Sequence, residues 1–201
     1  MKKEEILTAA LGLAAEHGLG AVSMGMIAER VGVKKPSLYN HFSSKEELTE
    51  EMYRYLREKA KANTRSDMTD MRAFFQGKSA YEILKSAVDG YGAIVRDPNM
   101  HTFYKVIYSE RCRHPAAAKI LVEETEKMIL ATKQLFYAME VHRLLHFEDP
   151  DMSAESFALT VHAMMDLGED RTVAGCGDAE TAEASIREYL CWFCHVNSVK
   201  E

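Results

Sequence analysis

Apolar residues recur every three to four positions along almost the whole chain of 201 residues, the spacing of one face of an α-helix. No alternating run rich in Val, Ile or Thr is long enough to indicate a strand. The pattern therefore predicts an all-α protein. Breaks in it predict helices over about residues 3–17, 23–31, 34–42, 45–63, 79–96, 99–111, 115–146, 152–173 and 179–198, with 64–77 left unassigned.

Residues that start or stop helices mark the first boundaries. Gly18 can adopt the left-handed conformation that ends the first helix. Ser23 is expected to cap the second, and Pro36 suits the first turn of the third because its missing N–H would be unpaired there. The fourth helix has two alternative capping boxes, Ser43 with Glu46 and Ser44 with Glu47.

Composition and charge are those of an ordinary globular chain, with 47% apolar and 28% charged residues. The net charge of −6 argues against coating of nucleic acid by the whole molecule. Locally the picture differs, because the segment from Arg30 to Lys45 has four basic residues and no acidic one. A patch of this kind is what phosphate neutralisation requires.

The longer stretch from Ser23 to Lys45 has the form of a helix-turn-helix, in which two short helices meet at a turn containing Gly32. Small Ala28 would let the helices cross closely. The apolar residues expected to pack the two helices together are Ile27, Ala28, Val31, Val33, Leu38 and Phe42.

Side-chain chemistry suggests roles on the exposed side of this motif. Lys34, Lys35 and Ser37 begin the second helix, the end that reaches base edges in the major groove. The residues suited to phosphate oxygens are Tyr39, His41, Lys45 and, on the opposite flank, Ser23.

The stretch from Val22 to Leu48, with Gly-Val, Leu-Tyr-x-His-Phe and Ser-Lys-Glu at their spacings, resembles the DNA-binding signature of the TetR family. The resemblance covers about the first 50 residues. One departure is Lys34, where members often carry a capping Ser or Thr. The resemblance implies phosphate contacts by Tyr39, His41 and Lys45. The full set predicted to bind DNA is Ser23, Lys34, Lys35, Pro36, Ser37, Tyr39, Asn40, His41 and Lys45.

The resemblance also implies a division of labour, with a DNA-binding domain over 1–48 and a helical effector-binding and dimerisation domain over 49–201. The implied function is a ligand-responsive transcriptional regulator, with repression the favoured output. It would bind double-stranded palindromic operator DNA as a homodimer and be released by a small effector. A helical enzyme and a protein-interaction adaptor are the alternatives.

The last two predicted helices would form the homodimer. Each carries an apolar face, which either meets a partner or fills the chain's own core. The residues on these faces are Ala158, Val161, His162 and Met165, and Ala182, Ile186, Tyr189, Leu190 and Phe193.

A small, partly apolar effector would bind among the middle helices, where Met and aromatic side chains adapt to apolar molecules. Thr125 and Thr132 could offer hydroxyls. The same side chains could instead be plain core. The candidates are Tyr91, Met100, Phe103, Tyr104, Tyr108, Thr125, Met128, Thr132, Phe136, Met139 and Met164.

Other signals carry less weight. Cys191, Cys194 and His195 match a haem-attachment pattern that requires export, but Glu4 and Glu5 interrupt any export signal, so buried packing and a reducing cytoplasm are expected. His142 and His146 stand at helical i, i+4 spacing, which suits a metal site or simple histidines. A sensing role for these cysteines and histidines stays open. We expect no membrane span, metal, cofactor or catalytic constellation.

Overall fold

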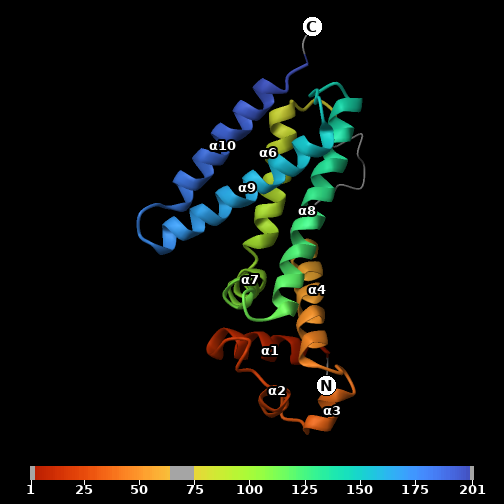
Figure 1. Ribbon diagram of the computed structural model, residues 1–201, viewed down its shortest axis with the longest axis vertical. Coiled ribbons are helices and arrows are strands. Elements are labelled where there is room, and N and C mark those ends of the chain that lie inside the picture. Colours follow the sequence, from red (N-terminus) through yellow and green to blue (C-terminus); the bar gives the residue numbers. More distant parts are fainter. Residues whose placement is uncertain (1–2, 64–74, 200–201) are drawn as a thin grey trace. The chain divides into compact units, whose positions relative to one another are not determined.

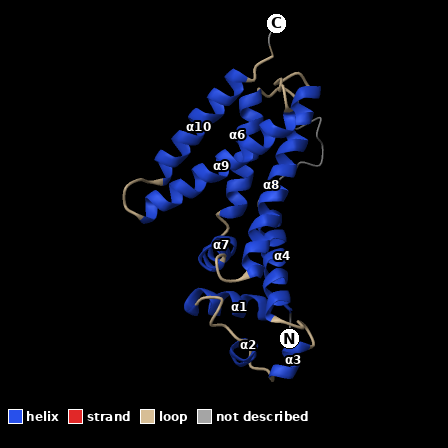
Figure 2. Cartoon of the chain, viewed as in Figure 1, coloured by secondary structure: helices blue, strands red, loops and turns tan. Residues whose placement is uncertain are grey.

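The computed structural model describes residues 3–63 and 75–199, and every regular element in these ranges is a helix (Figure 2). The all-α prediction is therefore confirmed. Their bounds are α1 Lys3–His17, α2 Met24–Arg30, α3 Lys35–Tyr39, α4 Lys45–Asn63, α6 Ala80–Val95, α7 Pro98–Glu110, α8 Pro115–Val141, α9 Pro150–Val173 and α10 Ala179–Val196. The unassigned segment 64–77 lies largely outside the described residues.

Packing divides the chain into two compact units. Unit 1 consists of residues 1–66 and 91–124, and unit 2 of 67–90 and 125–201. Two helices, α6 and α8, contribute one end to each unit (Figure 1). This division follows packing rather than chain order. The predicted functional boundary after residue 48 is a separate matter and stays a prediction.

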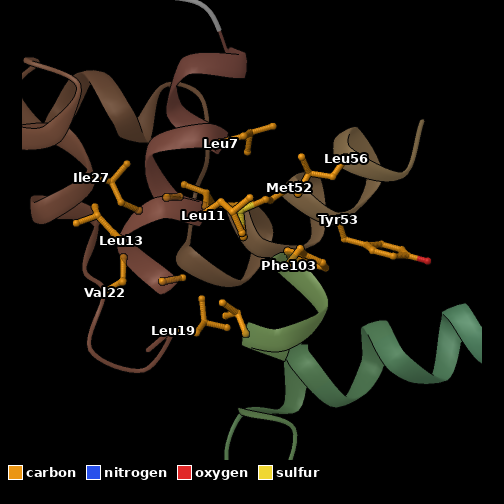
Figure 3. Close-up of a cluster of buried hydrophobic side chains, with 14 of the residues drawn as sticks. Leu7, Leu11, Leu13, Leu19, Val22, Ile27, Met52, Tyr53, Leu56 and Phe103 are labelled. Atoms are coloured by element: carbon orange, nitrogen blue, oxygen red, sulfur yellow. The ribbon is translucent and has the colours of Figure 1, made fainter. Parts of the chain in front are cut away.

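The core of unit 1 is built around α1, whose buried face contacts α2, α4 and α7. Leu7, Leu11 and Leu13 line this face, and Ile27, Met52 and Phe103 meet it from the other helices (Figure 3). The three-helix segment that carries the predicted motif is thus part of a larger packed unit.

The core of unit 2 is dominated by phenylalanine rings. Phe136 stacks on Phe147 with ring centroids 4.5 Å apart, and it meets Phe157 edge-on at 5.3 Å. Phe193 completes the group at 5.5 Å from Phe136. Aromatic pairs in these arrangements stabilise a core beyond the area that they bury.

The apolar faces of α9 and α10 pack against each other within the chain, where the two helices lie side by side (Figure 1). Ala158 and Val161 of α9 and Ile186, Leu190 and Phe193 of α10 are buried there. These residues had been candidates for a partner's surface. Of the two alternatives for them, the intrachain core is the correct one.

Helix α8 ends at Val141, five residues earlier than predicted. Arg143 adopts a positive φ of 55°, and the Leu144 N–H donates to the Met139 carbonyl at 2.9 Å, which closes the helix. His142 and His146 therefore do not share one helix face, and the i, i+4 metal-site interpretation was wrong. The described residues contain no group of three or more His, Cys, Asp or Glu side chains able to hold a metal ion.

None of the helices in the described ranges combines the length and the apolar character needed to cross a bilayer.

Candidate DNA interface

The turn between α2 and α3 depends on Gly32, which has a φ of +72°. The Gly32 N–H donates to the Glu29 backbone carbonyl at 3.0 Å, and the Val33 N–H donates to the Ala28 carbonyl at 2.9 Å. These two hydrogen bonds form a Schellman motif. A left-handed residue is required at this position, and glycine adopts it without strain. The turn therefore fixes the direction in which α3 leaves α2.

Helix α3 is held by its inner side chains and exposes the rest. Leu38 and Phe42 are almost fully buried in the core of unit 1. Eight of the nine predicted DNA-binding residues are solvent-exposed, namely Ser23, Lys34, Lys35, Pro36, Ser37, Tyr39, Asn40 and His41. The motif thus exposes mainly polar side chains around the buried Leu38.

The recognition helix is shorter than predicted and is weakly capped. It covers Lys35–Tyr39, so that Asn40 and His41 lie in the turn that follows. Lys34 is the N-cap residue and makes no side-chain capping bond, as its departure from the family pattern suggested. The first N–H groups of α3 are therefore not satisfied by that side chain. Free N–H groups at a helix start favour an anion.

Two exposed side chains of α3 lie against each other. The Lys35 ammonium is 5.9 Å from the centre of the Tyr39 ring, and the ring is 45% exposed. A cation over an aromatic face restricts the lysine without neutralising its charge. Lys35 and Tyr39 therefore present a charge and a hydroxyl group from one small surface.

Ser23 caps α2 as predicted, because its Oγ accepts a hydrogen bond from the Met26 N–H at 3.2 Å. Its side chain is nevertheless exposed, and the hydroxyl hydrogen remains able to donate. Ser23 can thus hold the helix start and still meet a phosphate.

Lys45 differs from the other eight residues, because it is half-buried. Its ammonium donates to the carbonyls of Leu19 at 2.9 Å, Gly20 at 3.3 Å and Val22 at 3.1 Å. An ammonium has three donors, and here all three have acceptors. Lys45 therefore ties the start of α4 to the loop between α1 and α2, a role that sequence reasoning missed.

The basic patch is also smaller than its sequence suggests. The Arg30 guanidinium forms hydrogen bonds with both carboxylate oxygens of Glu16, at 2.8 and 3.2 Å. This pairing raises the pKa of Arg30 and lowers that of Glu16. Of the four basic residues in the segment, Arg30 and Lys45 already have partners within the chain. Lys34 and Lys35 are the two exposed lysines at the tip of the motif.

The start of α4 uses the Ser44–Glu47 alternative in part, because the Glu47 carboxylate reaches back to Ser43 rather than to the Ser44 N–H. Ser44 Oγ accepts from the Glu47 N–H at 3.1 Å. The Glu47 carboxylate in turn accepts from the Ser43 N–H at 2.7 Å and from the Ser43 hydroxyl at 2.6 Å. The Ser43 hydrogen bonds lower the pKa of Glu47. This cap sets the helix start at which Lys45 lies.

The predicted effector residues are spread over both units. Met100, Phe103 and Tyr104 belong to the core of unit 1, and Phe136 and Met139 to that of unit 2. The Thr132 hydroxyl donates to the Met128 carbonyl of its own helix at 2.9 Å. The partly buried candidates are Tyr91, Tyr108, Thr125, Thr132 and Met164. A single pocket made of all these residues stays a prediction.

The cysteines and histidines that were set aside have separate surroundings. Cys194 is half-buried, and burial raises the pKa of its thiol to about 11, whereas Cys191 is exposed. The expectation of buried packing therefore fails for Cys191. His142 stacks on Phe75 with centroids 4.6 Å apart, while His146 lies 3.5 Å from the Glu140 carboxylate.

Comparison with known proteins gives a family for the N-terminal segment. Residues 6–52 match the model of the tetR family of bacterial regulatory proteins. The HTH-type transcriptional repressor KstR2 of Mycobacterium tuberculosis is 42% identical over 53 residues, and the Mycolicibacterium smegmatis protein of the same name is 40% identical. Each match covers 26% of this chain and only 26% of the relative's own length.

Solved structures match nearly the whole chain. The flavonoid-responsive regulator FrrA superposes with a TM-score of 0.73 at 26% identity, covering 99% of this chain and 98% of FrrA. A protein from Mesorhizobium loti assigned to the TetR family gives a TM-score of 0.74 at 19% identity, over 98% and 96% of the two chains. The signature of the tetR family thus lies in the first quarter of the chain, and nearly the whole chain shares its fold with the Mesorhizobium loti protein and with FrrA.

Proposed function

We propose that the protein is a repressor of transcription that binds palindromic operator DNA as a homodimer and is released by a small effector molecule. The observation that carries the proposal is the exposed surface from Lys34 to Tyr39, at the start and along the length of α3. The helix-turn-helix holds this surface in place through its buried inner side chains. Lys35 and Ser37 would meet base edges, while Ser23, Tyr39, Asn40 and His41 would meet phosphates and fix the register.

Lys45 has a different place in this proposal from that implied by the family resemblance. Its three carbonyl acceptors favour a positioning role, in which it holds the α1–α2 loop and, through it, Ser23 at the start of α2. A direct phosphate contact would require the ammonium to give up at least one of these carbonyls.

A homodimer is required because one short helix reads only a few base pairs. Two recognition helices of a symmetric pair can enter major grooves about 34–36 Å apart, one turn of the duplex. Several large apolar side chains of α9 and α10 support self-association because they are not used in the core. Leu159 is 43% exposed and Trp192 56%, and the others are Met152, Leu167, Val173 and Val196.

Release by an effector would follow from a population shift. In one conformation of the dimer the two recognition helices are wrongly spaced for the operator. An effector that binds this conformation more tightly raises its population, and the affinity for DNA falls accordingly. The name of FrrA, a flavonoid-responsive regulator of similar fold, supports a small-molecule effector as the class of signal.

The test is selection of bound fragments from a pool of genomic DNA, followed by titration of the enriched sequence at several salt concentrations. We expect Tyr39→Ala to weaken binding to all sequences without changing the salt slope, because its hydroxyl is neutral, and Lys35→Ala both to reduce the salt slope and to relax sequence preference. Lys85→Ala is the matched control, because this exposed lysine of α6 pairs with Asp89 on its own helix. An equal loss on every sequence for Lys35→Ala would contradict its base-reading role.

Self-association is tested by sedimentation of Leu159→Lys and Trp192→Lys. Both changes should shift the protein towards monomer and weaken operator binding together, while Val122→Lys on the exposed surface of α8 should do neither. Sequence-selective binding by a stable monomer would refute the dimer, and an absence of sequence preference at all salt concentrations would refute the regulator.

A further inference from the structure

The core of unit 1 contains a buried ionic group. Glu124 is only 3% exposed, and its carboxylate accepts hydrogen bonds from the Tyr53 hydroxyl and from Nη1 of Arg57. In Figure 3 the Tyr53 ring lies beside Phe103 with its oxygen directed away from the labelled aliphatic side chains. A buried ion pair is costly to desolvate and adds little net stability, so stability alone does not account for this one.

Two hydrogen-bond donors beside this ion pair have no partner. Among the residues that the structure describes, Arg57 Nε and the Tyr104 hydroxyl are the buried side-chain polar atoms without a hydrogen bond. Tyr104 is 7% exposed, and its phenol interacts electrostatically with both Glu124 and Arg57. Unpaired buried polar atoms are rare in folded proteins because each keeps its full desolvation cost.

The chemistry of the two atoms restricts what could pair with them. The guanidinium N–H only donates, and burial together with the Glu124 carboxylate raises the pKa of Tyr104, so its phenol also keeps its proton to donate. The missing partner is therefore an acceptor. Because Glu124 already neutralises Arg57, an anionic acceptor would be buried beside the Glu124 carboxylate with no positive charge left to compensate it.

The side chains around Arg57 and Tyr104 indicate what the rest of the ligand would be. Phe103 is fully buried, stacks on Tyr53 at 5.9 Å and meets Tyr104 edge-on at 6.3 Å, while Met100 is also fully buried. Such a lining favours an aromatic body. Neither orphan atom is reached by solvent, so an acceptor can approach only when the neighbouring side chains move apart.

We propose that Tyr104 and Arg57 anchor the carbonyl oxygen of a neutral aromatic effector, which enters when the side chains around Tyr104 separate. This inference rests on the proposed regulator and names the chemical class of its ligand. In the opened conformation the ligand gives hydrogen-bond partners to two donors that otherwise have none. The free energy gained by these hydrogen bonds favours the opened conformation over the closed one.

The position of Arg57 gives the ligand a route to the DNA-binding motif within unit 1. Tyr53 and Arg57 lie on α4, and Lys45 at the start of the same helix holds the loop that precedes α2. Twelve residues of helix separate Arg57 from Lys45, about 18 Å. A shift of α4 that accommodates the ligand would therefore move the support of the recognition motif.

The first experiment needs no ligand. Tyr104→Phe removes an unpaired hydroxyl, so the Tm of the purified full chain should stay unchanged or rise by about 2–4 °C. Tyr137→Phe is the matched control, because that exposed hydroxyl donates to Asp151 at 3.3 Å and its loss should not raise the Tm. A clear fall in the Tm of Tyr104→Phe would overturn the proposal, since it would mean that the hydroxyl is paired within the protein.

The second experiment measures the Tm with three aryl ketones of increasing size and their deoxygenated counterparts. The pairs are acetophenone with ethylbenzene, benzophenone with diphenylmethane, and 2-acetylnaphthalene with 2-ethylnaphthalene, and benzoate is the anionic comparison. At least one ketone should raise the Tm of the unmodified protein more than its hydrocarbon and more than benzoate. In Tyr104→Phe that advantage should disappear, while in Tyr137→Phe it should persist.

Equal shifts for ketone and hydrocarbon, a ketone advantage that survives in Tyr104→Phe, or no shift with any pair would each refute the proposed ligand class. DNA is absent from both measurements, so the two proposals fail separately. Selective DNA binding without a larger Tm shift for any ketone than for its hydrocarbon would refute only the ligand class. A larger shift for a ketone without selective DNA binding would refute only the regulator.

Discussion

The two units of this molecule build their cores differently. Unit 2 is closed by stacked and edge-on phenylalanine rings, whereas unit 1 encloses an arginine, a glutamate and two tyrosines. Among the described residues, the buried polar or charged side chains Thr49 and Glu124 both belong to unit 1. Apolar packing is sufficient for stability, so the polar interior of unit 1 suggests a second task, namely coupling a ligand to the motif that binds DNA.

The largest expected effect in this contrast between an aromatic and a partly polar core lies in unit 2. Phe136 is fully buried and touches three other phenylalanine rings, so Phe136→Ala should lower the free energy of unfolding by about 5 kcal/mol. Chemical denaturation measures the change. Exposed Val141→Ala, on the same helix, should change it by less than about 0.5 kcal/mol. A loss below about 2 kcal/mol for Phe136→Ala would mean that this core is loosely packed.

The second prediction concerns the ion pair of unit 1. Glu124→Met leaves the Arg57 charge buried without its partner, and we expect a loss of about 3 kcal/mol in unfolding free energy. The double variant Glu124→Met with Arg57→Met should recover the part of that loss that comes from the unpaired charge, because an apolar pair needs no desolvation, while the Tyr53 hydroxyl lacks its Glu124 acceptor in both variants. A double variant as unstable as the single one would show that the pair stabilises unit 1, and the contrast with unit 2 would disappear.

Local patterns allowed most of the fold to be predicted. Helical periodicity and residues such as Ser23 and Gly32 act within a few positions of the chain, and these helices formed close to their expected bounds. The exposed side of α3 followed for the same reason, since Leu38 and Phe42 fix which side chains face inward. The end of α8 was missed because Arg143, rather than a glycine, adopts the left-handed conformation.

Contacts between distant positions could not be predicted in this way. Glu124 lies 67 residues from Arg57 and 71 from Tyr53, and no local pattern pairs them. Lys45 was assigned to phosphate by its chemistry and by the family resemblance, and the carbonyls that it binds were missed because they lie 23 to 26 residues earlier in the chain. In both cases a charged side chain of α4 has partners that come together only through tertiary packing.

The third prediction separates the two possible roles of Lys45. Lys45→Met removes the ammonium from three carbonyls and should cost about 1–2 kcal/mol of unfolding free energy, whereas exposed Lys34→Met should cost almost nothing. Both variants should also bind DNA less tightly. Undiminished stability in Lys45→Met, measured by chemical denaturation, would return this residue to a simple phosphate contact.

The smallest effect lies in the cap that precedes Lys45, and it depends on pH. Hydrogen bonds from Ser43 hold the pKa of Glu47 below its ordinary value of 4.5, so the ionised form stabilises the folded protein above that pH. This contribution is lost as the pH falls through the lowered pKa. Because the carboxylate is exposed, Glu47→Gln should lower the Tm at pH 7 by only about 1 °C.

The pH course distinguishes this cap from a general effect of charge. The Tm difference between the unmodified protein and Glu47→Gln should stay constant from pH 7 to about pH 5 and then shrink towards pH 3, where protonated Glu47 and glutamine are nearly alike. Glu123→Gln on α8 is the comparison for loss of a carboxylate charge alone. Glu123 lies outside any helix cap, and its carboxylate is as far as 4.0 Å from the Lys119 ammonium. If the difference for Glu47→Gln instead grew as the pH fell, the carboxylate would be destabilising when ionised, and the start of α4 would depend on Lys45 and Ser44 alone.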